Sequence, residues 1–243
     1  MSSIVQRMNY FAIEQDKKQK SESKSRTLTI ISLSPDLWLM PTPRMHITAL
    51  ELAHSRTAPE IAAIREALEP TIPRIANHTF RHRSRLVKPM VSYDLSALAL
   101  SFLPAAGEQA SSPPNSASSA AAQGQGEGEE EEKHNDAYTY HHLRRDLWTI
   151  SKEEAGLEIA SRYIVPSAHI TLGRYLGETD HDTPQKRAAW VKAIDEINAW
   201  LEAEVWSTNG GGEWFVGQER GLDVRVGQLW YGGGRSVMLG EGF

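Results

Sequence analysis

Two distant stretches of the chain carry nearly the same short pattern, a His-x-Thr tripeptide between apolar residues. They are His46-Ile47-Thr48 and His169-Ile170-Thr171, and a proline-containing turn precedes each. Apolar flanks favour a β-strand, and side chains alternate along a strand, so the histidine and threonine of each copy are expected on one face. The repetition predicts two strand-bearing halves that together present two imidazoles and two hydroxyls.

The pairing is informative, whereas a single copy is not. With 9 histidines in 243 residues and threonine at about one residue in twenty, about half a His-x-Thr is expected by accident. A third copy, His181-Asp182-Thr183, lacks apolar flanks, and we expect Thr183 to cap a helix that begins at Pro184. A lone histidine on a strand is more often a polar residue of a half-buried face than a catalytic one. Two matching copies reverse that expectation.

The composition is that of a globular protein, with 40% hydrophobic and 23% charged residues. The chain has no cysteine, which excludes disulfides, thiolate nucleophiles and cysteine-ligated metals. No stretch has the pattern of a secretory signal or of a membrane-spanning helix. We therefore expect a monomeric protein of the cytoplasm or nucleus with no membrane partner.

Acidic residues are concentrated in one segment. Residues 105–136 are rich in Ala, Ser, Gly and Glu, lack apolar periodicity and contain seven acidic residues and one lysine. We predict a disordered insertion in a surface loop, because such a segment buries too little apolar surface to offset its ordering entropy. The total charge of −5 then leaves +1 for the rest of the chain. A nearly neutral folded part favours a small phosphate ester over duplex DNA as a partner.

The remaining sequence predicts one domain, residues 26–243, after a polar N-terminal segment of residues 1–25. Alternation and apolar runs predict strands, and 3.6-residue spacing predicts helices. The expected strands are 26–33, 45–52, 85–93, 97–103, 163–175, 213–216, 222–231 and 236–239. The expected helices are 59–68, a segment of 140–160 that breaks near Ser151 or Gly156, and a long helix that starts at Pro184. This order is typical of an α+β fold with mostly antiparallel strands.

The side chains of the paired motifs suit one reaction, the opening of a cyclic phosphodiester. That reaction needs a base that takes a proton from the attacking water and an acid that protonates the leaving oxygen. Histidine can play either role near neutral pH. The threonine hydroxyls would donate hydrogen bonds to the non-bridging oxygens as their charge grows. This chemistry requires neither a metal nor a cofactor.

His46-x-Thr48 and His169-x-Thr171 resemble the paired motifs of the 2H phosphoesterase superfamily. The stretches 38–48 and 169–174 are most similar to its RNA ligase/2′,3′-cyclic nucleotide phosphodiesterase type, and the chain is similar to fungal members from residue 26 to 243. The resemblance implies a bilobal fold of two mostly antiparallel sheets with pseudo-twofold symmetry and flanking helices. One motif from each lobe would face a shared cleft. The implied activity is metal-independent hydrolysis of 2′,3′-cyclic phosphates of nucleotides or RNA ends to 2′-phosphates.

The resemblance also implies roles for individual residues. His46 would protonate the 3′ oxygen and His169 would activate water, although the symmetry leaves the reverse assignment open. The phosphate would be bound by Thr48, Thr171 and Arg174. Strict alternation turns Arg174 away from His169, so it is either re-aimed by a bulge that Gly173 allows or a surface cation.

A base of the substrate would stack on an aromatic side chain. Tyr175 is the first candidate, because alternation puts it on the His169 face, and Trp38 and Trp230 are further candidates. Two other functions stay open: RNA trimming or ADP-ribose cyclic phosphate hydrolysis at the same site, and a non-catalytic nucleotide- or RNA-binding module. The histidines in both copies argue against the module, because binding alone could use arginine or lysine.

Two further groups of residues are interpreted as structural or solvated. The short basic stretch of residues 81–88 could steer RNA phosphates, but such stretches are usually solvated. The adjacent His141 and His142 lack the spacing of metal ligands.

Overall fold

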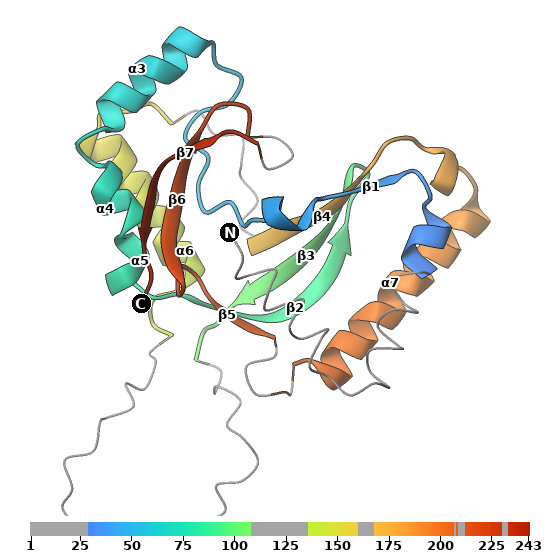
Figure 1. The fold of residues 1–243 in the computed structure, drawn as a ribbon. Coiled ribbons are helices and arrows are strands. Elements are labelled where there is room, and N and C mark those ends of the chain that lie inside the picture. The colour runs from blue at the N-terminus through green and yellow to red at the C-terminus, as the bar shows by residue number, and fades with distance from the viewer. Residues whose placement is uncertain (1–28, 108–135, 160–167, 207, 209–211, 230–232) are drawn as a thin grey trace, which may run out of the picture.

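Two antiparallel sheets form the centre of the molecule. The computed structural model describes residues 29–107, 136–159, 168–206, 208, 212–229 and 233–243. Its larger sheet has the strand order β1-β4-β3-β2-β5 and curls, as Figure 1 shows, whereas the second sheet is the pair β6-β7. The strands are β1 (Leu37–Leu39), β2 (Arg85–Tyr93), β3 (Ala97–Pro104), β4 (Ala168–Tyr175), β5 (Glu213–Phe215), β6 (Arg220–Val226) and β7 (Arg235–Glu241). The predicted α+β class with antiparallel strands is confirmed.

The two faces of the larger sheet differ in burial. On one face the apolar side chains Leu98, Leu100 and Ile170 are almost fully buried. Helix α7 (Pro184–Glu204) covers this face, and Asn198 of α7 bonds to both the amide and the carbonyl of Val91. Figure 1 shows α7 along the outer side of the curled sheet. The alternate residues of β3 and β4 are half-buried and point to the opposite face.

The start of α7 follows the sequence prediction. The side chain of Thr183 accepts a hydrogen bond from the amide of Lys186 at 3.2 Å, and Pro184 is the first helical residue. An oxygen at this position satisfies an amide that has no partner within the helix. This cap accounts fully for the third His-x-Thr, which lies outside the strands.

A second group of helices packs around the β6-β7 hairpin. It comprises α3 (Ala58–Leu68), α4 (Ile72–Ala76), α5 (His78–Arg81), α6 (Tyr140–Thr149) and the π-helical turn η2 (Ile150–Glu154) that continues α6. Helices α4 and α5 contact the hairpin directly. Glycine is needed there: a Cβ on Gly240 would lie 2.0 Å from the carbonyl oxygen of Ala76 in α4. The predicted helix at 59–68 is confirmed, and the predicted break near Ser151 or Gly156 corresponds to a change from α-helix to π-helix at Ile150, with the helical run ending at Glu154.

Two predicted strands are wrong. Residues 29–33 form a short helix, in which Ile31 is 41% exposed while the buried Ile30 and the half-buried Leu33 are three residues apart, as on one side of a helix. Of the predicted strand 45–52, only Ile47 pairs with another strand, in a single bridge. The segment lies at the edge of β4, and the carbonyl of Thr48 accepts a hydrogen bond from a tyrosine side chain instead of a strand amide.

The two ends of segment 105–136 contact the same residue, Arg85 of β2. The amide of Ala105 donates to the carbonyl of Arg85 at 2.9 Å, and the Arg85 guanidinium forms an ion pair with Asp136. Both ends of the predicted insertion are therefore part of the folded structure, and residues 108–135 lie outside the described part.

The two sheets have five and two strands, so the described residues do not confirm the pseudo-twofold pair of lobes that the resemblance implies. Among the described helices, none combines the length and the apolar character that crossing a bilayer requires.

Candidate active site

The two His-x-Thr motifs lie side by side and run antiparallel. After β1 the chain leaves the sheet through a 3-10 turn, η1 (Thr42–Arg44), and returns where Ile47 bridges Ile170 of β4. One step to either side of an antiparallel bridge, His46 is opposite Thr171 and Thr48 is opposite His169. In a regular antiparallel ladder two residues related in this way are diagonal neighbours about 7–8 Å apart.

The motif on β4 turns its polar side chains away from α7. Ile170 is completely buried on the face that α7 covers, so by alternation His169 and Thr171 point to the opposite face. His46 and Thr48 flank Ile47, which pairs with Ile170 in a single bridge outside any regular strand. His46 is exposed, and the other three side chains are half-buried. The bridge therefore brings the two motifs together at the edge of β4.

The same face carries two serine hydroxyls that the sequence analysis missed. Ser101 of β3 is directly opposite His169, and its Oγ lies 2.6 Å from the Oγ of Ser92 on β2. No motif marks these serines, and only the strand register brings them beside the histidine. They extend the row of polar groups from β4 across β3 to β2.

One nitrogen of His46 is held by the backbone. Its Nδ1 lies 2.8 Å from the carbonyl oxygen of Arg44, at the end of η1. A carbonyl oxygen only accepts hydrogen bonds, so Nδ1 donates and carries a proton. Nε2 is then the nitrogen at which His46 can take up or release a proton.

The first motif is also held by helix α6. The hydroxyl of Tyr140, a completely buried side chain, donates to the carbonyl of Thr48 at 2.9 Å. The sequence placed Tyr140 in a helix but gave no sign of this contact, because the two residues are 92 positions apart.

A β-bulge determines where Arg174 points. Thr171 is opposite Ala99 and Gly173 is opposite Leu98, so Leu172 is an extra residue of β4. Its carbonyl accepts the amide of Met40 at 2.8 Å. The pair Arg174 and Ala97 follows, and Ala97 has the same parity on β3 as Ala99. The bulge therefore puts Arg174 on the face of His169 and Thr171, the first of the two predicted alternatives.

Arg174 has a carboxylate in its surroundings. Asp94 lies in the turn between β2 and β3, and its pKa is lowered. Desolvation raises this pKa, but hydrogen bonds from Ser96 and Ala97 and the positive charge of Arg174 together lower it by more. An anion bound at Arg174 would share the guanidinium with this carboxylate.

The same bulge turns Tyr175 to the other face, so the expectation that it stands beside His169 is wrong. Its ring contacts Trp190 of α7 at 5.8 Å and His181 at 5.1 Å between ring centroids. Burial there raises the pKa of Tyr175 to about 12. The strict alternation used in the prediction fails at Leu172, where one residue is added.

The other stacking candidates differ in position. Trp38 of β1 is opposite Arg174 and is half-buried, so the register puts it on the site face. Trp230 lies outside the described residues. Among the described residues, no three His, Asp or Glu side chains gather as a metal site would require.

Comparison with known proteins gives no relative: no family model, no curated protein and no solved structure matches the chain.

Proposed function

We propose that the protein is a metal-independent phosphodiesterase that opens 2′,3′-cyclic phosphates of nucleotides or RNA ends to 2′-phosphates. The observation that carries the proposal is the bridge between Ile47 and Ile170, which brings the two His-x-Thr motifs side by side. Two imidazoles on either side of one phosphorus atom are the minimum that acid–base opening of the ring needs.

The reaction has one bond made and one broken. A water oxygen attacks phosphorus while one histidine takes its proton, and the bond from phosphorus to the 3′ oxygen breaks as the other histidine protonates that oxygen. Thr48 and Thr171 donate to the non-bridging oxygens, whose negative charge increases in the transition state. Arg174 adds a positive charge on the same face. The Nδ1 contact of His46 directs its proton exchange to Nε2.

The test is hydrolysis of 2′,3′-cyclic AMP in the presence of EDTA. We expect turnover by the wild type and its loss in His46→Ala and His169→Ala. His54→Ala is the matched control, because His54 is a half-buried histidine of the loop after the first motif and lies 3.8 Å from Glu51. Equal rates in all four proteins would refute the proposal, and loss of the wild-type rate in EDTA would refute its metal independence.

A further inference from the structure

Helix α6 has an outward face that is basic and aromatic. Its core side holds Leu143 and Leu147, which are buried. On the opposite side, the helical spacing of three and four residues aligns one set of side chains. The set is His141, Arg144, Arg145, Trp148 and Lys152, of which all but Arg144 are exposed.

Trp148 is an unusual surface residue. Its side chain is 38% exposed, and the Nζ of Lys152 lies 4.7 Å from the centre of its ring. An exposed indole with a cation over one face offers its other face and edge to a ligand.

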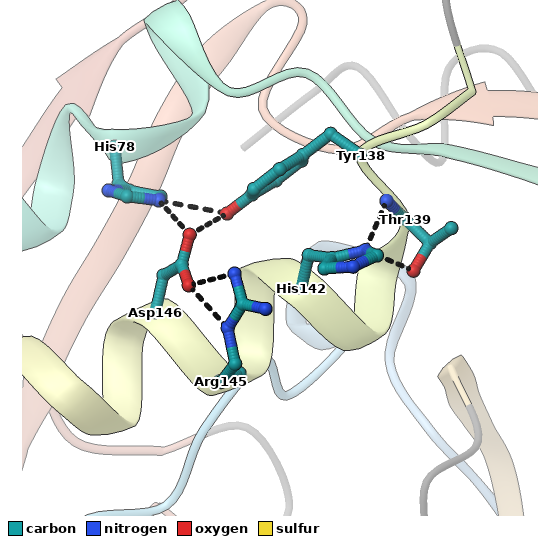
Figure 2. A network of polar contacts seen from close by, with 6 residues as sticks. All are labelled: His78, Tyr138, Thr139, His142, Arg145 and Asp146. Atoms are coloured by element: carbon teal, nitrogen blue, oxygen red, sulfur yellow. Dashed lines mark hydrogen bonds and ion pairs between the residues drawn. The ribbon is translucent and has the colours of Figure 1, made fainter.

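A network of polar contacts joins this helix to His78, the first residue of α5, as Figure 2 shows. The hydroxyl of Tyr138 donates to Asp146 of α6 at 2.9 Å and lies 2.9 Å from the Nε2 of His78 of α5. The ring of His82 stacks on that of His78 at 4.4 Å and lies 5.3 Å from that of Tyr138. These contacts hold the exposed His82 beside Tyr138, just before α6, and the exposed Arg81 precedes His82 in the chain.

Positive charge dominates the two segments. Residues 74–83 and 140–152 contain six arginines and lysines, four histidines and a single carboxylate, in a chain whose net charge is −5. Two of the arginines have acidic partners, since Arg74 pairs with Glu154 and Arg145 pairs with Asp146. Arg81 and Lys152 add charge at the two ends of this surface.

We infer that the outward face of α6, with Arg81 and His82 of the α5 end, is a binding surface for single-stranded RNA. Phosphates of a nucleic acid bind arginine and lysine, and unpaired bases stack on exposed aromatic and imidazole rings. An acidic peptide would use the cations but leave Trp148 and the His82 ring unexplained.

The first turn of α6 lies against the first motif, because the buried Tyr140 bonds to the carbonyl of Thr48. The outward face is on the other side of the helix, so an RNA whose cyclic 3′ end lies at the motifs would reach it by passing around this end of α6. This inference rests on the proposed function for its substrate, and it names an RNA end rather than a mononucleotide.

Binding of a fluorescent oligouridylate with a 3′ hydroxyl tests the surface without any reaction. We expect Trp148→Ala to weaken binding about five- to hundredfold, as loss of base stacking does, and Trp148→Phe to restore most of it. Lys152→Glu should weaken binding and flatten its salt dependence. Lys192→Glu is the matched control, because this 79%-exposed lysine of α7 gives the same change of net charge elsewhere.

The outcomes separate this inference from the proposed function. The inference is overturned if the wild type does not bind oligouridylate, or if Lys152→Glu and Lys192→Glu weaken binding equally. It predicts that Trp148→Ala raises KM for an RNA with a cyclic 3′ end and leaves 2′,3′-cyclic AMP turnover unchanged. No turnover of either substrate by the wild type would refute the phosphodiesterase while RNA binding persists.

Discussion

At the scale of single residues, the fixed nitrogen of His46 is the clearest chemical feature of the site. The carbonyl of Arg44 holds Nδ1, so the ring has a defined orientation before any substrate binds. His169, on a regular strand, has its orientation set by the register opposite Ser101. The two histidines therefore reach their positions by different means, and they need not have equivalent roles.

A sulfur substitution would assign those roles. In a substrate with sulfur in place of the 3′ bridging oxygen, the leaving thiolate needs no protonation, so the general acid becomes dispensable. If His46 is the acid, we expect His46→Ala to hydrolyse this substrate at nearly the wild-type rate, whereas His169→Ala stays inactive. The measurement is kcat for each variant on the oxygen and sulfur substrates. The opposite pattern would exchange the roles.

Replacement of the threonines tests the hydroxyl donors. We expect Thr171→Val to lower kcat by about 10²–10³, the usual cost of losing one donor to a developing oxyanion. Thr171→Ser keeps a hydroxyl and should retain most of the activity. Steady-state kinetics with 2′,3′-cyclic AMP compare the two, and equal losses would show that Thr171 contributes shape rather than a hydrogen bond.

His78 should make the stability of the fold sensitive to acid. Desolvation and the neighbouring positive charges of His82 and Arg74 lower its pKa below 6.5, although Asp146 opposes this. Below about pH 6.5 the unfolded chain binds a proton that the folded chain excludes, so the free energy of unfolding is highest above that pH and falls on acidification. We expect His78→Gln to reduce the fall in melting temperature between pH 7.5 and 5.5, and the exposed His141→Gln to leave it unchanged.

At the scale of elements, the bulge at Leu172 decides which side chains of β4 meet. Before it His169 and Thr171 point away from α7, and after it Arg174 points away while Tyr175 faces Trp190. The neighbouring strand β1 approaches β4 closely at Gly173. A Cβ on Gly173 would lie 2.9 Å from the carbonyl oxygen of Trp38, so only glycine fits between β4 and β1 without a shift of the backbone.

Replacement of this glycine tests the fit. Gly173→Ala is expected to destabilise the protein by about 1–3 kcal/mol, because a rigid backbone atom must move. Gly177→Ala is the control, since the nearest atom would lie at an ordinary 3.6 Å. Urea unfolding measures the free energy of unfolding of both variants. Equal values would show that β1 can move away from the added methyl group without a loss of stability.

The sequence predicted regular elements well and the details of the site only in part. The motif strand β4, the hairpin of β2 and β3 and the cap of α7 follow from local patterns that tertiary contacts leave in place. The first motif does not form the expected strand, because its hydrogen bonds depend on Arg44, Tyr140 and Ile170, and no local pattern encodes the last two. Tyr175 was misplaced because a bulge leaves no unambiguous mark in the sequence.

At the scale of the whole molecule, Arg85 joins segments that are far apart in the sequence. Its side chain and that of Asp136 are only 3% and 4% exposed, and Glu213 of β5 lies 3.0 Å from the same guanidinium. The hydrogen bonds that its guanidinium donates to Asp136 raise the pKa of Arg85, so the side chain remains charged. One cation thus joins β2, β5 and the start of the helical segment that leads into α6.

Loss of this cation should be costly. We expect Arg85→Met to destabilise the protein by about 3–5 kcal/mol, because a buried carboxylate loses its partner. Arg65→Met removes an exposed ion pair with Glu69 and should cost about 0–1 kcal/mol. The midpoint of urea unfolding measures both, and similar values for the two variants would contradict a joining role for Arg85.

The contacts of Arg85 also predict that residues 108–135 are not needed for folding. Ala105 and Asp136 both contact Arg85, so residues 108–135 can be replaced by a short Gly/Ser linker without separating the elements that they connect. We expect the shortened protein to unfold cooperatively at the wild-type urea midpoint and to act on 2′,3′-cyclic AMP at the same rate as the full-length chain. A lower midpoint would show that the removed residues contribute contacts to the fold.

The extra residue of β4 also bears on how such a site can change in evolution. Because Leu172 is the extra residue, its deletion would join Thr171 directly to Gly173 and restore regular pairing, with Arg174 still on the site face and Tyr175 still facing α7. The loss of one codon would therefore remove the bulge without moving a side chain from one face to the other. A chain of this kind can gain or lose the extra residue while both His-x-Thr motifs and Arg174 keep their places.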